Sequence, residues 1–429
     1  MSADPDAGPL QSPAGLGLHR WNDRAVLGAA VAAFAAGFGQ FGVVAALGDV
    51  AKGFGQVTHG ASLADQAGLS GTELGIGLAI MRLASLGGLP ITGLADRYGR
   101  RMMLLLTVGA GLVLTAVAAA SPSYWWFVAI FACGRPLLSA ASGLAQVTAA
   151  ELTSSADRAK AVALIAAGYG VGAGVIAIAA SLASAALGFR GVFVLALLPL
   201  ALLALLRRWI TEPSRFTVAA ARSEHPVPVL GALARPFRRR LAVIVALAFA
   251  VSVITGPANS FIFLVAQNLL RQQGIVTVGM VVAAGVAGLA GLLAGRWLSD
   301  RVGRLLTGAI AMVAVALFAA LAYTGSALAL LAGYILGVFA GSVFAPAMGS
   351  LVNELFPTSV RASVAGWSLA AGVLGAVVGL VVFGAVADID NQFAVAGLIT
   401  FLPAALAAVL FWPLPETRGR EPEDLWPDP

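Results

Sequence analysis

Long apolar runs alternate with short polar segments along almost the whole chain. A helix needs about 20 apolar residues to cross the hydrocarbon core of a bilayer. Twelve runs of that kind lie at 25–48, 73–94, 102–120, 124–150, 160–187, 190–210, 241–268, 275–298, 305–324, 327–352, 363–387 and 391–413. The strict alternation of transmembrane β-strands is absent. The pattern therefore predicts an all-α membrane protein with twelve transmembrane helices.

The basic residues are distributed unequally between the two sides of the predicted membrane. Of the 26 Lys and Arg, 21 fall on the side that carries both ends of the chain, two lie inside spans, and three fall on the other side: Lys52, Arg190 and Arg271. Cytoplasmic loops carry an excess of basic residues. We therefore expect a multi-pass protein of the cytoplasmic membrane with both termini in the cytoplasm.

The longest polar connection between spans is the segment 211–240, which contains four prolines. It separates two six-span halves, 25–210 and 241–413, and tails at 1–24 and 414–429 flank them. We expect this connection to be a cytoplasmic linker with short helices on the membrane surface.

Composition agrees with a membrane protein and excludes several other classes. The chain is 59% hydrophobic and 11% charged, whereas soluble domains carry about 25% charged residues. The basic residues cluster between apolar runs, so they do not indicate nucleic acid. Cys133 is the single cysteine, and we expect it in the core. The spans hold no paired carboxylates, His clusters or Cys–His pairs, so no enzyme, metal or cofactor site is predicted.

Short polar elements of the first half recur in the second half at one spacing. The repeated elements are Asp96–Arg100 (DRYGR) and Asp300–Arg304 (DRVGR), Glu151 with Arg158 and Glu354 with Arg361, and Glu212 beside Pro213 and Glu416 beside Pro415. The offsets are 203 or 204 residues. The two halves are therefore copies with parallel topology, and the substrate site is expected between them.

Several of these segments resemble signatures of the major facilitator superfamily. Gly93–Arg101 (GLADRYGRR) resembles its loop 2–3 signature, and Gly134-Arg135 with Gly143 resembles its span-4 motif. Asn353–Thr358 (NELFPT) and Pro415–Gly419 (PETRG) are similar to signatures of the sugar-porter and metabolite–proton symporter branches. The resemblance covers residues 25–420 and implies two six-helix halves that exchange access to a central site.

The family resemblance also implies a cytoplasmic lock that stabilises the outward-open state. Arg and Asp at span ends can tie one helix to the next, and we expect these bonds only when the cytoplasmic ends are close. From the resemblance we assign this role to Asp96, Arg97, Arg101, Glu151, Arg158, Asp300, Arg301, Arg304, Glu354 and Arg361. The alternative is that these residues only determine topology.

Two arginines lie inside predicted spans, and neither has a counterpart in the other half. Arg82 is near the middle of span 2, and Arg135 lies in the outer half of span 4. A charge at such depth is costly unless it faces water or a partner. We expect Arg135 to be the principal contact of an anionic solute, with Arg82 as a second contact or field-setting neighbour.

Polar side chains at helical spacing extend this candidate site. Ser139, Ser142 and Gln146 follow Arg135 on one face of span 4, Thr255 and Asn259 share a face of span 7 with Ser252, and Gln40 is in the middle of span 1. The alternative role is hydrogen bonding between helices. None of the 20 acidic residues falls mid-span. Only Asp49 and Glu73, at span edges, remain as candidates for proton coupling.

The sequence favours a monomeric carrier of a small organic solute, an organic anion by preference, moved by alternating access with or without protons. Sugars or other neutral metabolites are the alternative, because of the loop 10–11 and tail signatures. Two departures weaken other possibilities. Ala36–Gly39 (AGFG) lacks the span-1 Asp of proton symporters, and Tyr169–Gly174 (YGVGAG) lacks the span-5 proline of drug exporters. A non-transporting sensor is a further alternative, but no long signalling domain is present. No phosphate-binding loop for ATP exists.

Overall fold

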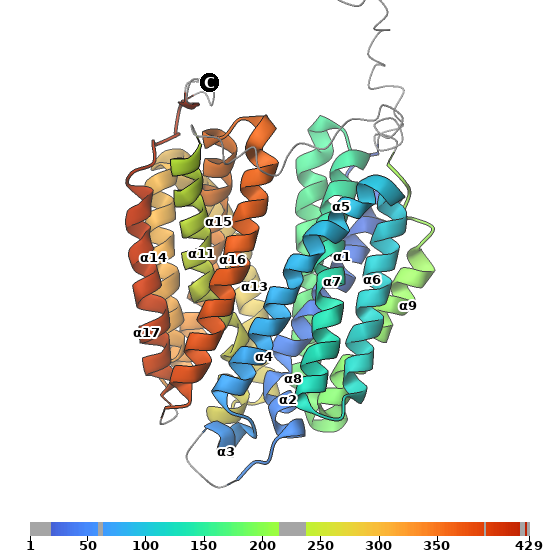
Figure 1. Cartoon of the computed structure of the whole chain (residues 1–429), viewed down its shortest axis with the longest axis vertical. Helices are drawn as coiled ribbons and strands as arrows, with labels where there is room; N and C mark the ends of the chain where they lie inside the picture. Colours follow the sequence, from blue (N-terminus) through green and yellow to red (C-terminus); the bar gives the residue numbers. More distant parts are fainter. Residues whose placement is uncertain (1–18, 59–62, 214–236, 390–391, 421–424, 427–429) are drawn as a thin grey trace, which may run out of the picture.

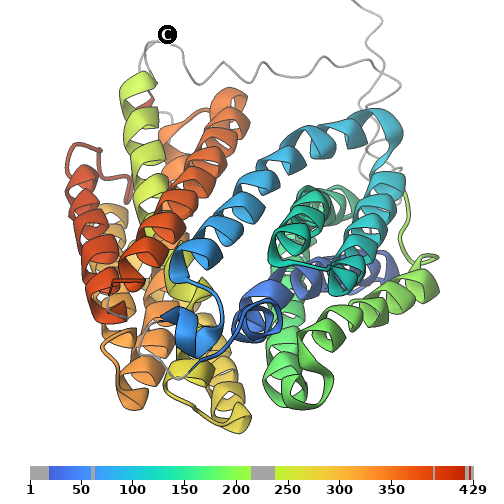
Figure 2. The same cartoon turned by 60° about the horizontal axis from the view of Figure 1, so that its bottom comes forward.

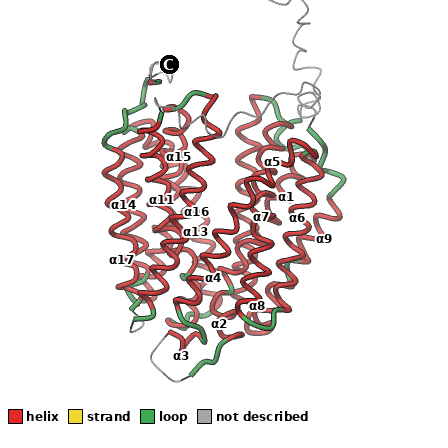
Figure 3. The backbone as a smooth tube through the Cα atoms, viewed as in Figure 1, coloured by secondary structure: helices red, strands yellow, loops and turns green. Residues whose placement is uncertain are grey.

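The structure is a computed structural model that describes residues 19–58, 63–213, 237–389, 392–420 and 425–426. Twelve helical segments within these ranges are long and apolar enough to span a membrane, which confirms the predicted count. The described part of the chain contains helices and loops but no strands (Figure 3). Most of the predicted linker, including any surface helices, lies outside the described residues.

The first half contains the helices up to residue 206 (Figure 1). They are α1 (Arg24–Ala45), α2 (Leu47–Phe54), α3 (Leu63–Ala67), α4 (Gly71–Ala84), η2 (Ser85–Gly87), α5 (Gly88–Tyr98), α6 (Arg100–Val117), η3 (Ala118–Ala120), α7 (Tyr124–Leu152), α8 (Ser155–Val194) and α9 (Leu197–Leu206). The second half begins after the linker. Its helices are α11 (Arg238–Ser260), α12 (Ile262–Leu264), η5 (Val265–Leu269), α13 (Gly274–Arg301), α14 (Arg304–Ala322), α15 (Ala327–Leu355), α16 (Thr358–Ala387), α17 (Phe393–Ala405) and η6 (Leu406–Phe411).

Several predicted boundaries shift for local reasons. The span predicted at 73–94 is α4 and α5 joined by the short turn η2. Pro90 has no backbone N–H and its ring crowds the carbonyl four residues earlier, which accounts for the interrupted helix just before it. The spans predicted at 160–187 and 190–210 are joined within α8 through a kink at Gly188, whose φ is 61°. Cys133, expected in the core, is exposed on α7.

The two halves diverge toward one face of the molecule and meet at the other (Figures 1 and 3). We call the first the tail face; it carries the helix ends at Arg24, Arg100 and Arg304. Here each half has its own buried apolar core. The opposite face, called the sealed face, carries the start of α4 and the end of α16. Here one apolar core includes residues of both halves.

Contacts between the halves join α4 to α16 and α8 to α13. Figure 2, turned to bring the sealed face forward, shows α4 beside α16. The backbones of α4 and α16 approach very closely here. A Cβ atom at Gly71 would lie only 2.6 Å from the carbonyl oxygen of Gly384. Only glycine permits this crossing, and the small residues let the two halves close against each other.

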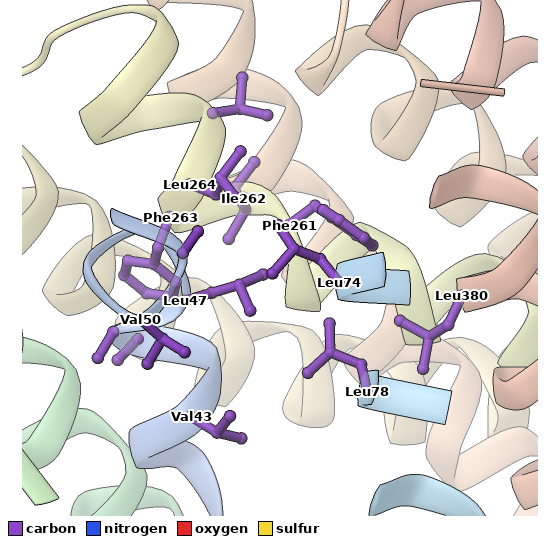
Figure 4. Close-up of a cluster of buried hydrophobic side chains, with 14 of the residues drawn as sticks. Val43, Leu47, Val50, Leu74, Leu78, Phe261, Ile262, Phe263, Leu264 and Leu380 are labelled. Atoms are coloured by element: carbon purple, nitrogen blue, oxygen red, sulfur yellow. The ribbon is translucent and has the colours of Figure 1, made fainter. Parts of the chain in front are cut away.

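Buried side chains from both halves form an apolar plug at the sealed face (Figure 4). Val43, Leu47 and Val50 come from α1 and α2, and Leu74 and Leu78 come from α4. The other half contributes Phe261–Leu264 and Leu380. Most of these side chains are 0–5% exposed, so the plug excludes water from the space between the halves on this side.

Candidate functional site

A cavity of about 280 Å³ lies between the halves, above the apolar plug. Helices α1, α4, α7, α8, α11 and α16 line it. The structure brings five of the eight predicted solute-binding residues to its wall: Gln40, Arg82, Arg135, Thr255 and Asn259. The described lining contains these two arginines and no carboxylate. The central cavity therefore has an uncompensated positive charge facing its interior.

Arg135 is held mainly by the neighbouring helix α1. Its guanidinium donates from Nη1 to the carbonyl oxygen of Gln40 at 2.8 Å, and the Gln40 side chain donates to the carbonyl of Leu138 at 2.9 Å. Arg135 is only 9% exposed, and its Nε is buried without a hydrogen-bond partner. This reciprocal pair ties α1 to α7, so Arg135 has a structural role in addition to lining the cavity.

Arg82 is the more accessible of the two guanidinium groups. It lies two residues before the end of α4 and is exposed. It lines the central cavity and also a larger cavity of about 530 Å³ between α11, α15 and α16. The second cavity lies toward the tail face, where the two halves have separate cores. Arg82 therefore stands where a solute arriving from the tail face would enter the central cavity.

The polar stripe predicted on α7 does not end up in the central cavity. Ser139 lines a different cavity, of about 510 Å³, beside α5. Ser142 donates to the carbonyl of Ser139 at 2.8 Å, and Gln146 is exposed. A stripe on one helical face runs along the helix axis, so Gln146 lies about 16 Å of helix rise from Arg135. The side chains share a face but not a level in the membrane.

Thr255 and Asn259 occupy the opposite wall, on α11. The Thr255 hydroxyl donates to the carbonyl of Val251 at 3.0 Å, and the Asn259 amide donates to the carbonyl of Thr255 at 2.9 Å. These donors are used within their own helix, which leaves oxygen acceptors and one amide N–H for a solute.

The two candidates for proton coupling lie at the sealed face, away from the described lining of the central cavity. Asp49 is half-buried in the first turn of α2. Glu73 forms a capping box with Ser70 at the start of α4, in which Ser70 Oγ accepts from the Glu73 N–H at 3.1 Å. Glu73 therefore stabilises a helix end. A coupling role for either residue stays a prediction.

Ion pairs at the tail face join helices within each half. Arg100 binds both carboxylate oxygens of Glu151 at 3.1 Å and also contacts Asp96 at 2.8 Å. In the second half the equivalent residue, Arg304, forms ion pairs with Glu354 at 3.2 Å and with Asp300 at 3.4 Å. Both networks are present although the halves are separated at this face. Their formation therefore does not require the two halves to approach, contrary to our expectation.

The arginine at the centre of the first network is Arg100, which is not among the lock residues that we selected from the sequence. Arg100 forms the ion pair with Glu151, whereas Arg97 stacks on the ring of Tyr98 at 5.6 Å and Arg101 is exposed. The offset of 204 between Arg100 and Arg304 was the signal that identifies it. The remaining predicted lock residues lie as follows: Arg158 is exposed, Arg301 stacks on Trp297 at 5.2 Å, and Arg361 donates to the carbonyl of Phe356 at 2.8 Å.

The repeated Glu-Pro elements close the turns between paired helices. Glu212 accepts from the backbone N–H of Arg100 at 2.6 Å and of Arg101 at 3.1 Å. Glu416 accepts in the same way from Arg304 at 2.9 Å and Leu305 at 3.1 Å. A carboxylate is favourable at these positions because it satisfies free N–H groups and the positive end of the helix dipole.

The turn glycines make room for these carboxylates. Gly99 and Gly303 have φ of 97° and 122°, a region that glycine adopts without strain. Burial by itself would raise the pKa of the Glu416 carboxyl, but backbone N–H groups of Arg304, Leu305, Arg418 and Thr417 together hold that pKa below its ordinary value.

Asp388 is a site residue that sequence reasoning missed. It follows the last residue of α16, and its carboxylate accepts hydrogen bonds from the first turn of α4 in the other half. The partners are the backbone N–H groups of Gly71 and Thr72 and the hydroxyl of Thr72. No sequence motif marks this residue, because its partners are about 316 positions away.

Twelve membrane-spanning helices in two repeated halves around a central cavity define a polytopic membrane transporter. The family model described as Major Facilitator Superfamily matches residues 29–324 and 260–426. The chain therefore belongs to the major facilitator superfamily and is a transporter of small solutes, not an enzyme.

Relatives and solved structures agree with this assignment. A Cupriavidus pinatubonensis protein named "Probable 4-methylmuconolactone transporter" is 28% identical over 372 residues, which cover 82% of this chain and 84% of the relative. The xylose transporter XylE from E. coli, in an inward-open conformation, superposes with a TM-score of 0.68 at 18% identity and covers 94% of this chain and 99% of that one. A crystal structure of the nucleoside transporter NupG gives a TM-score of 0.73 at 14% identity, over 90% of this chain and 99% of that one.

Proposed function

We propose that this protein transports a small organic anion across the cytoplasmic membrane by alternating access. The observation that carries the proposal is the exposed guanidinium of Arg82 in a central cavity whose described lining has no carboxylate. Arg82 and Arg135 repel each other across a space of low dielectric constant, so an entering anion relieves that repulsion and gains hydrogen bonds. A carboxylate or phosphate matches the planar fork of Arg.

The relative named for 4-methylmuconolactone, an organic anion, supports the same substrate class. In this proposal Arg82 is the principal solute contact and Arg135 the secondary one, in the reverse order of the expectation from sequence. Thr255 and Asn259 contact the neutral part of the solute from the opposite half.

A neutral metabolite such as a sugar is the second candidate. It is supported by the Asn353–Thr358 signature and by the fold shared with xylose transporters. Hydroxyl groups would then use Gln40, Thr255 and Asn259. An anion is favoured because this alternative leaves the charge of Arg82 without a function in the cavity.

The membrane orientation follows the distribution of basic residues. The tail face carries Arg100, Arg304 and their networks, so we assign it to the cytoplasm together with both termini. The structure then corresponds to an inward-facing state of a monomer. Reopening requires the α4–α16 contact at the sealed face to break while the tail ends approach. Coupling to protons is part of the proposal only through Asp49 or Glu73.

The test is ligand-induced stabilisation of the purified full-length chain. A ligand that binds only the folded state raises the melting temperature by mass action. The panel comprises acetate, benzoate, 4-methylmuconolactone, inorganic phosphate and xylose. We expect stabilisation by at least one organic carboxylate and its loss in Arg82→Gln. Stabilisation by xylose alone, unchanged in Arg82→Gln, would establish the neutral-solute alternative.

A further inference from the structure

Another cavity, of about 360 Å³, lies inside the C-terminal half between α11, α14 and α15, and we call it the C-half cavity. Thr255 and Asn259 line both this cavity and the central one, so the two share a wall. The described lining of this C-half cavity has no charged residue. Its surface consists mainly of apolar side chains, glycines and the ring of Tyr334. It is therefore suited to an apolar group and unsuited to a carboxylate.

Glycines on one face of α15 create part of this space. At Gly333 a Cβ would lie 2.5 Å from the backbone nitrogen of Ala322, so this glycine permits close packing of α14. Gly337 and Gly341 differ, because a Cβ there would meet the nearest atom at only 3.8 Å or 4.0 Å, an ordinary contact. Packing against α14 does not require glycine at these two positions. Their missing side chains instead leave open volume on the cavity wall.

Aromatic rings lead from the central cavity toward this space. Phe41 lines the central cavity, and its ring centre is 6.1 Å from that of Phe263 in an edge-to-face arrangement. The Phe263 ring is 6.4 Å from Tyr334, which lines the C-half cavity. Such edge-to-face contacts form a continuous apolar surface. Among the described lining residues, charged side chains thus lie only on the central-cavity side of the Thr255–Asn259 wall.

We propose that the C-half cavity is a subsite for the apolar body of the transported solute. This inference rests on the proposed organic-anion function and narrows the class of substrate. The substrate is an amphipathic carboxylate with a ring or branched apolar group. The carboxylate binds Arg82 in the central cavity, and the apolar group extends past Thr255 and Asn259 toward Tyr334. Gly337 and Gly341 determine the size of the group that is accepted.

The experiment measures dissociation constants of acetate, butyrate, benzoate, 4-phenylbutyrate and 4-methylmuconolactone with the purified full-length chain by calorimetry. Each buried methylene is worth about a fourfold change in affinity. We expect at least one ring-bearing probe to bind about ten times more tightly than acetate. Gly337→Val and Gly341→Val should erase most of that difference and leave acetate binding unchanged. Gly285→Val is the matched control, because Gly285 is exposed on α13 with no atom near its Cβ position.

The possible results separate this inference from the proposed function. If no carboxylate binds the wild-type chain, the organic-anion function is wrong and the subsite is overturned with it. If carboxylates bind through Arg82 but the two valine variants keep the preference for rings, only the subsite is overturned. If either valine variant fails to fold, Gly337→Ala and Gly341→Ala fill less of the cavity. The structure accommodates a Cβ atom at both positions, because the nearest atoms lie 3.8 Å and 4.0 Å away. These variants should reduce the preference for 4-phenylbutyrate by about threefold or more, and an unchanged preference contradicts the proposal.

Discussion

The Asp388 carboxylate at the end of α16 accepts a hydrogen bond from the backbone N–H of Thr72 at 2.8 Å. The two residues belong to different halves of the transporter, and the contact lies at the face where the halves meet. An anion at a helix N-terminus satisfies free N–H groups and interacts favourably with the helix dipole. This bond exists only while the sealed face is closed, so it stabilises the state seen in this structure.

The first prediction concerns this contact. Asp388→Asn keeps the size of the side chain but removes its charge and one acceptor oxygen, and loss of a negative charge at a helix N-terminus costs about 0.3–2 kcal/mol. The open fraction of the sealed face should rise about 2- to 30-fold. The measurement is the maleimide labelling rate of Leu74→Cys, a fully buried position in the apolar plug, in a Cys133→Ser background.

Glu73→Gln is the matched control for this experiment. Glu73 is a carboxylate in the same first turn of α4, but its capping contacts are with Ser70 of its own half. The variant removes the same charge from the same helix end and keeps a capping-box residue, so labelling should not increase comparably. Equal labelling in the two variants would mean that Asp388 is not specific to the closed sealed face.

A second prediction separates the roles of the two cavity arginines. Arg82→Gln should weaken binding of a carboxylate probe about 10- to 100-fold, because a charged hydrogen bond is lost, and should leave the melting temperature nearly unchanged. Arg135→Gln should lower the melting temperature by several degrees, because the Gln40 carbonyl loses its donor and α1 is less firmly held to α7. Both quantities are measured on the same purified variants. An Arg135→Gln protein that melts normally but does not bind would restore Arg135 as the principal contact.

A third prediction concerns the network around Arg100. Arg100→Gln leaves Glu151, whose side chain is 23% exposed, without its bidentate partner. Loss of such a partner costs about 1–3 kcal/mol, so the variant should unfold at lower denaturant concentration. Arg101→Gln removes the same charge from an exposed neighbour and should have little effect. Arg304→Gln should reproduce the Arg100 result in the second half, and a harmless Arg304→Gln would show that the two networks are not equivalent.

A fourth prediction follows from the lowered pKa of Glu416. A carboxyl whose folded-state pKa lies below its ordinary value of 4.5 contributes stability above that pH and loses it as the pH falls through the folded-state pKa. Glu416→Gln should therefore melt below the wild type at pH 7, and the difference should shrink below about pH 4.5. Melting curves from about pH 3 to pH 8 test this expectation. Asp96→Asn serves as the control for general charge effects, because this carboxylate is 71% exposed and its ion pair with Arg100 should contribute little. A Glu416→Gln difference that does not vary with pH would contradict the assignment.

Much of the fold could be predicted from the chain because the information is local or repeated. Each apolar run is long enough to cross the membrane, so the twelve spans follow from length and hydropathy. The repeated Glu212 and Glu416 elements correctly indicated equivalent turns in both halves. The candidate site was predicted only in part: helical spacing grouped Ser139, Ser142 and Gln146 with Arg135, but it contains no information on which level of a helix faces a cavity.

The sequence by itself therefore determined the class of protein, the number of spans and the duplication of the two halves. Those properties arise from runs and spacings within one stretch of chain. The tertiary structure decided which partners meet: Arg135 with the Gln40 carbonyl, Asp388 with α4, and Thr255 and Asn259 as the wall between two cavities. Each of these relationships depends on how helices distant in the sequence tilt and cross. Hydropathy contains no record of such crossings, because a lipid-facing residue and a core residue are equally apolar.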